Sequence, residues 1–271
     1  MKEIKEEKEL TVARACRVME LERSMYYYQS VKEDMEVEDK LREYAERLPT
    51  RGFPEYFKRI RKEGIKWNHK RVRRVYKQLG MSRRKKGKRR IPNPDKRPLL
   101  QPVYPNLTWS MDFMHDALYN GRKFRTFNLI DDYNREALAI EVAYSLSSEM
   151  VIGVIQQIIE WRGKPLEIRS DNGPEFLAKA FEGFCQKSGI VHVRTQKGKP
   201  SQNGFIERFN RTYREDVLDA NIFETIQQVR ELTALWLDDY NNKHPHSSLN
   251  NMSPNEFLKT KMNKKMSNLA L

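Results

Sequence analysis

Three acidic residues of this sequence, Asp112, Asp171 and Glu207, stand in patterns that suit metal-assisted chemistry. Asp112 falls on the polar side of the alternating segment LTWSMDF, and Asp171 closes the strand-like segment LEIRSD before the turn residues 172–174. Glu207 lies on the polar face of a helical pattern over about residues 202–217. We therefore expect three carboxylates, from three different elements, to converge at one edge of a sheet.

Such a cluster is what phosphodiester chemistry requires. Two divalent ions roughly 3.5–4 Å apart can activate the attacking oxygen and stabilise the leaving oxygen. Hard ions such as Mg²⁺ prefer oxygen ligands, and they offset the repulsion between neighbouring carboxylates. Each of the three residues taken alone would be interpreted as ordinary solvated surface.

The elements around these residues alternate between strands and helices. Strand patterns occupy residues 107–113, 123–130 and 136–144, and two more follow at 166–171 and 190–195. Amphipathic helices are predicted over 147–161, 178–188, 202–217 and 225–241. This order predicts an α/β fold, a ribonuclease-H-like core with a five-stranded mixed sheet, over residues 106–271. It is an analogy of element order, and it does not by itself assign a function.

Residues 1–82 are expected to form a small all-α region that binds DNA. Two short helical patterns within residues 10–29 predict a helix-turn-helix, with an ordinary helical hairpin as an equal alternative. A second helical group ends at Gly80, and its last helix has Asn68 as N-cap. The cations of that helix are expected to face DNA: Lys70, Arg71, Arg73, Arg74 and Lys77.

Residues 83–105 are predicted to be a basic linker between the two regions. Nine of the fifteen residues at 83–97 are basic and only one is acidic, and the segment also contains two prolines and a glycine. Such a composition cannot form a packed core, and it suits a strap along phosphates. The expected contacts are Arg83, Arg84, Lys85, Lys86, Lys88, Arg89 and Arg90.

The overall composition supports a polyanionic partner and excludes several classes of protein. The net charge is +14 over 271 residues, which favours binding to nucleic acid. Two distant cysteines predict no disulfide framework, and the five histidines lack partner cysteines at zinc spacing. The sequence shows no membrane-spanning run and no signal-peptide core. We therefore expect a cytoplasmic, nucleoid-associated protein without structural zinc.

Several long segments resemble those of one protein superfamily. WSMDF, RSDNGPEF and KGKPSQNGFIERFNRTYREDVLD are similar to the catalytic signatures of DDE transposases and retroviral integrases. The chain most resembles the OrfB product of bacterial insertion sequences that are expressed by programmed frameshifting. That likeness extends to GIKWNHKRVRRVYKQLGM and to the tail DYNNKHPHSSLNNMSPNEF, and so covers most of the chain.

The resemblance implies a role for individual residues. It makes Asp112, Asp171 and Glu207 the ligands of two Mg²⁺ ions, with Mn²⁺ as a substitute. The basic residue seven positions after the glutamate corresponds to Arg214, which is expected to contact DNA. Further contacts are expected from the loop before the catalytic helix: Lys199, Gln202 and Asn203.

Other polar and aromatic residues near these signatures receive a structural interpretation. Asp131 and Asp132 lie in a turn outside the catalytic set, and Asn172 is interpreted as a turn-former. Trp109 is assigned to the core and not to base stacking.

The implied activity is cleavage and strand transfer of double-stranded DNA at insertion-sequence ends. The implied partners are further copies of the chain, assembled on DNA, and an upstream frame product as a fusion or separate subunit. Two alternatives stay open at this point. One is a simple ribonuclease-H-like nuclease, and the other is a DNA-binding regulator that occupies element ends without cutting them.

Overall fold

A computed structural model describes residues 11–27, 33–82, 99–195 and 203–269 of the chain. The chain divides into two compact units, Met1–Lys40 and Leu41–Leu271. Among the described residues, no helix has both the length and the apolar character needed to cross a membrane.

The first unit contains the two short helices that the sequence predicts. They are α2 (Val12–Val18) and α3 (Arg23–Tyr27), and a tight turn joins them. Glu20 takes a positive φ of 51°, and the Leu21 amide donates to the Cys16 carbonyl at 2.9 Å, which closes the first helix. The existence of both helices is confirmed. That they read DNA as a helix-turn-helix stays a prediction.

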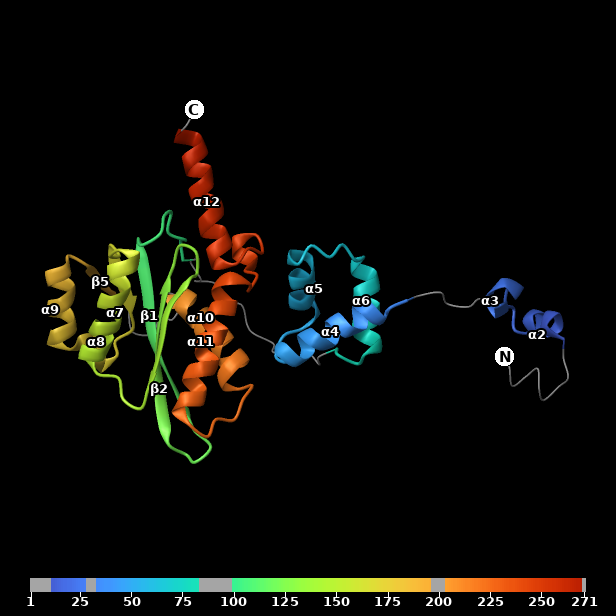
Figure 1. The fold of residues 1–271 in the computed structure, drawn as a ribbon, viewed down its shortest axis with the longest axis horizontal. Helices are drawn as coiled ribbons and strands as arrows, with labels where there is room; N and C mark the ends of the chain where they lie inside the picture. Colours follow the sequence, from blue (N-terminus) through green and yellow to red (C-terminus); the bar gives the residue numbers. More distant parts are fainter. Residues whose placement is uncertain (1–10, 28–32, 83–98, 196–202, 270–271) are drawn as a thin grey trace. The chain divides into compact units, whose positions relative to one another are not determined.

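A five-stranded mixed sheet organises the second unit (Figure 1). Its strands are β1 (Thr108–Ala117), β2 (Lys123–Asp131), β3 (Ala137–Ala143), β4 (Glu167–Ser170) and β5 (Val191–Arg194). Their order is β3-β2-β1-β4-β5. The first three strands pair antiparallel, and β4 pairs in parallel with both β1 and β5. This arrangement confirms the α/β class and the mixed five-stranded sheet expected from the sequence.

One face of the sheet packs against α7 (Ser148–Arg162), α8 (Pro174–Leu177) and α9 (Lys179–Ser188). Trp109, fully buried as predicted, lies in this core, and its indole N–H donates to the Asn106 side chain. The amphipathic helix predicted over 147–161 is confirmed as α7, which buries a narrow apolar stripe. Met150 is 44% exposed, because the buried stripe runs through Val151, Ile155 and Ile158.

The other face packs against α10 (Gly204–Tyr213), a π-helical turn η2 (Arg214–Leu218) and α11 (Ile226–Asn242). The helix predicted over about 202–217 is confirmed in extent, but its last turn is π-helical, with the Asp219 amide bonded back five residues to the Arg214 carbonyl. A short 3₁₀ turn, η3 (Ser247–Leu249), and a further helix, α12 (Pro254–Leu269), complete the chain. Helix α12 was not predicted from the sequence. With helices on both faces, even the polar side chain of Ser110 in β1 is fully buried.

Helices α4 (Met35–Arg47), α5 (Phe53–Lys62) and α6 (His69–Gln78) precede the sheet. The predictions for α6 are confirmed, because Asn68 caps it by accepting from the Lys70 amide and Gly80 follows it with a positive φ. Its apolar side is buried at Val72, Val75 and Tyr76.

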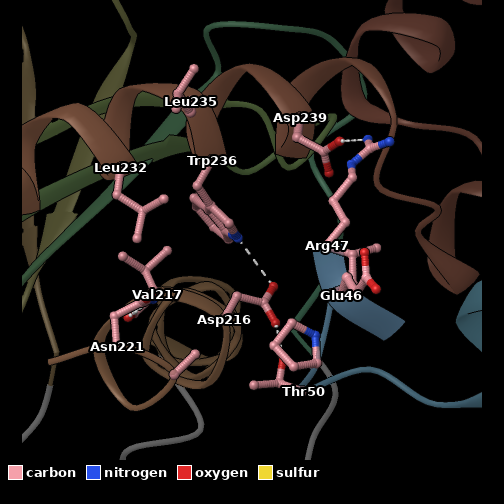
Figure 2. Close-up of a pocket in the computed structure, with 13 residues that line it drawn as sticks. Glu46, Arg47, Thr50, Asp216, Val217, Asn221, Leu232, Leu235, Trp236 and Asp239 are labelled. Atoms are coloured by element: carbon pink, nitrogen blue, oxygen red, sulfur yellow. Dashed lines mark hydrogen bonds and ion pairs between the residues drawn. The ribbon is translucent and has the colours of Figure 1, made fainter. Parts of the chain in front are cut away.

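Buried ion pairs attach this helical segment to α11 and η2. The guanidinium of Arg59, 5% exposed, donates to both carboxylate oxygens of Asp239 at 2.8 and 3.2 Å. Asp239 also accepts from Arg47, while Asp216 accepts from Thr50 at 2.6 Å and from the Trp236 indole at 3.1 Å (Figure 2). Helices α5 and α6 thus belong to the same unit as the sheet. The domain boundary expected at residue 82 stays a prediction, since residues 83–98 lie outside the described chain.

Asp239→Asn should lower the free energy of unfolding by about 3 kcal/mol, because it removes the negative charge that pairs with the two terminal nitrogens of the buried Arg59 guanidinium and leaves only Glu55, which bonds to its Nε. Its neighbour Asp238 is exposed and bonds only within α11, so Asp238→Asn should cost less than about 0.5 kcal/mol. Urea denaturation at neutral pH measures both. Equal costs for the two variants would contradict the proposed anchoring role.

The stabilisation that the Arg59–Asp239 ion pair gives to the fold should depend on pH. Although burial opposes it, the Arg59 hydrogen bonds lower the pKa of Asp239 below its ordinary value of 3.8. The stabilisation is therefore present above that value and is lost as the pH falls through the folded-state pKa.

Candidate carboxylate site

Asp112 lies at the centre of β1 and is held by two hydrogen bonds. Its Oδ1 accepts from the Phe113 amide, and its Oδ2 accepts from the Asn210 side chain, both at 2.8 Å. The Asn210 Oδ1 in turn accepts from Asn128 at 2.7 Å, and Asn128 lies opposite Asp112 on β2. A chain of hydrogen bonds therefore runs from β2 through α10 to the carboxylate of Asp112.

Asn210 and Asn128 were not among the predicted site residues. The sequence placed Asn210 on the same helix face as Glu207, three residues away, and that spacing was the available signal. The bond itself depends on how α10 lies against the sheet, which periodicity does not specify.

The charges of the two other predicted carboxylates act on Asp112. The pKa of Asp112 is raised to about 6, first by burial and then by the negative charge of Asp171, with a smaller contribution from Glu207. The Phe113 amide and the Asn210 side chain partly offset this rise, because they bond to the ionised form. Within the described residues, however, no group of three acidic, histidine or cysteine side chains lies close enough to enclose a metal ion.

Asp171 lies in an exposed loop whose shape is well defined. The Gly173 amide donates to the Asp171 Oδ1 at 2.9 Å, and a Cβ added at Gly173 would come within 3.1 Å of that oxygen. The Asn172 side chain donates to the Thr195 carbonyl just beyond β5 at 2.9 Å, which agrees with its predicted role as a turn-former. The loop thus holds Asp171 between the ends of two parallel strands.

Glu207 is exposed in the first turn of α10. A carboxylate in that position is favoured by the helix dipole, whose positive end is the N-terminus. Glu207 and Asn210 share one face of the helix, so the helix that presents Glu207 also supplies the donor to Asp112.

Arg214 lies two turns further along, where α10 gives way to η2. Its guanidinium contacts Asp116 Oδ2 at 3.2 Å and Asp219 Oδ1 at 3.6 Å, and it donates to the His115 carbonyl at 2.9 Å. Arg214 takes part in partly exposed ion pairs with acidic residues at the end of β1 and after η2. Arg214 therefore lies against the C-terminal end of β1, and its contact with DNA stays a prediction.

Asp131 and Asp132 are fully buried, and their partners give them a structural role. Asp131 accepts from the Asn106 and Tyr133 amides, and Asp132 accepts from Ser110 and Arg169. Asp132 lies in the turn after β2, as predicted, but the placement of Asp131 in that turn was wrong, because Asp131 is the last residue of β2.

The remaining predicted DNA contacts divide into two groups. On α6, Lys70, Arg73 and Lys77 are exposed and Arg71 and Arg74 are half-buried, while Asn203 is buried at the start of α10. The others lie outside the described residues: Lys199, Gln202, Arg83, Arg84, Lys85, Lys86, Lys88, Arg89 and Arg90.

The chemistry of the three carboxylates fits a divalent cation. All their donor atoms are oxygens, the ligands that Mg²⁺ and similar hard ions prefer. The pKa of Asp112 is raised first by burial and then by the negative charge of Asp171, and its hydrogen-bond donors only partly offset both effects. A cation at this place would favour the ionised form of all three side chains.

Comparison with known proteins gives consistent matches over most of the chain. Two family models, both described as integrase core domain, match residues 102–200 and 188–254. A 31.7 kDa protein of insertion element IS407 from Burkholderia multivorans is 35% identical over 95% of this chain and 94% of its own length. A 39.2 kDa protein of insertion element IS476 from Xanthomonas euvesicatoria is 34% identical over 92% of this chain and 72% of its own length.

Two more distant similarities extend over large parts of the chain. A protein of insertion sequence element IS150 from Escherichia coli, assigned as transposase InsK, is 25% identical over 89% of this chain and 91% of its own length. Among solved structures, the HTLV-2 integrase catalytic core domain in complex with magnesium aligns with a TM-score of 0.44 and 24% identity. That alignment covers 57% of this chain and 97% of the viral domain.

Two substitutions should move the pKa of Asp112 in opposite directions. Asp171→Asn removes a negative charge and should lower it below about 6, whereas Asn210→Ala removes a donor to the ionised form and should raise it. Titration of ¹³C-labelled aspartate carboxyls by NMR measures both shifts. Asp238→Asn is the control, and it should leave the Asp112 titration unchanged. If the pKa of Asp112 were unchanged in both variants, that result would contradict the described geometry.

Proposed function

Since this chain belongs to the integrase-core family of insertion-element transposases, we propose that it cuts DNA at the ends of its element and joins those ends to new sites, with Asp112, Asp171 and Glu207 as its catalytic carboxylates. The observation that carries the assignment of residues is that the charges of Asp171, in the loop after β4, and Glu207, in α10, reach Asp112 in β1 and raise its pKa. Each lies in a segment that resembles a catalytic signature of the superfamily.

In this proposal the three carboxylates would hold divalent cations, Mg²⁺ with Mn²⁺ as a substitute, which supply activation of the attacking oxygen and neutralise charge at the phosphorus. Asn210 and Asn128 orient the Asp112 carboxylate, and the Phe113 amide favours its ionised form. Because the pKa of Asp112 is near 6, most molecules carry an ionised Asp112 at neutral pH. The proposed site contains no zinc.

The reaction has two steps. First, the oxygen of a water molecule bonds to the phosphorus at the element end, the P–O bond to the 3′ oxygen breaks, and a free 3′ hydroxyl results. Second, that 3′ oxygen attacks a phosphodiester of the target and displaces its 3′ oxygen, so one phosphodiester replaces another. The side chains must keep the reacting groups aligned in both steps, which explains a rigidly held Asp112.

DNA would be held by surfaces on both sides of the catalytic site. We assign phosphate contacts to α6, to the basic segment 83–90 and to the loop residues Lys199, Gln202 and Asn203. Arg214, placed against the end of β1, would position a phosphate near the catalytic helix. The residues 1–82 would form the DNA-binding region. Further copies of the chain and an upstream frame product would complete the active assembly on nucleoid DNA.

Alanine at Asp112, Asp171 or Glu207 should abolish cleavage and strand transfer on labelled element-end duplexes in Mg²⁺, while DNA binding stays largely intact. The losses should not add in double variants, because the three residues act as one unit. Glu215→Ala, an exposed carboxylate on the adjoining turn, is the control and should retain activity. Near-parental turnover by Glu207→Ala would refute the catalytic assignment. If the parent protein binds the element ends but never cuts them, that result would support the alternative function of a DNA-binding regulator.

The DNA contact assigned to α6 can be tested without changing the buried face of the helix. The exposed cations to change are Lys70, Arg73 and Lys77. Changing all three to Gln should weaken duplex binding. It should also reduce the slope of log K against log[salt] by roughly 0.9 for each phosphate that the helix no longer neutralises. Deleting the helices would uncover buried residues of the same unit, so charge substitution is the better design. Fluorescence anisotropy between low and high KCl measures the slope. An unchanged slope in the triple variant would remove α6 from the interface.

A further inference from the structure

A cavity of about 420 Å³ lies beside α10, between that helix, α5 and the segment 244–248. The helix contributes five residues to it, spaced at i, i+1, i+4, i+5 and i+8, which is a single helix face. They are Gly204, Phe205, Arg208, Phe209 and Thr212. Glu207 and Asn210 lie on the opposite face, so one helix separates the cavity from the carboxylate site.

The charge lining this cavity is strongly positive. Four cationic side chains and one carboxylate line it: Arg51, Lys58, Arg135, Arg208 and Glu55. The carboxylate is already bonded to the buried Arg59 at 3.1 Å.

The cations differ in how far other groups already engage them. Arg51 pairs with Asp216, and Arg135 donates to the Asp132 carbonyl and lies 3.4 Å from the centroid of the Phe205 ring. Arg208 is exposed and has no ion-pair partner among the described residues, and Lys58 reaches only the Ser247 hydroxyl, at 3.3 Å. The cavity therefore has unneutralised positive charge at its rim.

The imidazoles of His244 and His246 line the same cavity, and neither adds charge to it. His244 stacks on Tyr240 with ring centroids 5.4 Å apart, and His246 meets the edge of both rings. Burial, followed by the nearby charges, lowers the pKa of His246 to about 3 and lowers that of His244 as well, so both are neutral. The Nε2 of His246 is buried and has no hydrogen-bond partner within the described part of the chain.

We propose that this cavity binds a backbone phosphate of the same DNA strand that passes Glu207, a few nucleotides from the reacting phosphodiester. The inference rests on the proposed function. Arg, Lys, Ser and Thr side chains are the usual partners of DNA phosphates, and the lining offers all four. A helix with its side chains is about 10–12 Å across, which corresponds to roughly three nucleotides at 3.4 Å per step.

The test combines a double variant with DNA whose charge is removed one phosphate at a time. Element-end duplexes carry a single neutral methylphosphonate at successive positions around the cut, and binding is measured without divalent ions. The parent should lose roughly tenfold in affinity at one position, the value expected for a charge-assisted contact. Lys58→Gln/Arg208→Gln should bind unmodified DNA more weakly by a similar factor and should be insensitive to methylphosphonate at that position.

Arg61→Gln/Lys187→Gln removes the same amount of charge from exposed positions outside the cavity and serves as the matched control. It should keep the full sensitivity of the parent. If every methylphosphonate affects the cavity variant and the parent equally, the cavity holds no phosphate and the inference fails. Thermal melts confirm that both variants fold. Cleavage by the parent in Mg²⁺, measured in parallel, tests the proposed function separately, because the parent should cut the element ends whether or not the methylphosphonate scan assigns a phosphate to the cavity.

Discussion

The repulsion between like charges is the constraint around which this site is built. Asp112 must stay oriented although burial and two neighbouring carboxylates oppose its ionisation. The hydrogen bonds from Asn128 through Asn210 meet this need, because they join β2, α10 and β1 at one point. The same contact sets how α10 lies on the sheet, and so determines where Glu207 is presented on one face and the basic cavity on the other.

The elements of the site could be predicted because each has a local signature. Alternation placed Asp112 on a strand, a glycine turn placed Asp171 at a strand end, and helical spacing placed Glu207 on a polar face. Local patterns cannot show a bond such as Asn210 to Asp112, which depends on the angle and register of a helix against a sheet. The π-helical turn after Tyr213, which changes the direction of Arg214, has no simple sequence signature either.

Long-range polar pairs were the other feature that the sequence could not reveal. Arg59 and Asp239 are far apart in the chain, and each looks like an ordinary charged residue in its own helix. In a chain with 51 basic residues, charge alone does not distinguish an anchor from a DNA contact. Only burial separates them: Arg59 is 5% exposed and bonded on several sides, whereas Arg208 is exposed and lies at the rim of a cavity.

The position of α10 late in the chain also matters during synthesis. Strands β1 to β3 form a local meander that can assemble early, but β4 must pair in parallel with β1 across a long connection. Glu207 and the apolar side of α10 reach the sheet only afterwards, so a shorter product would leave Met114 and Ile130 uncovered. Asp112 and Asp171 alone do not make the proposed site. An interrupted translation product that ends before α10 is therefore expected to lack the proposed cleavage activity.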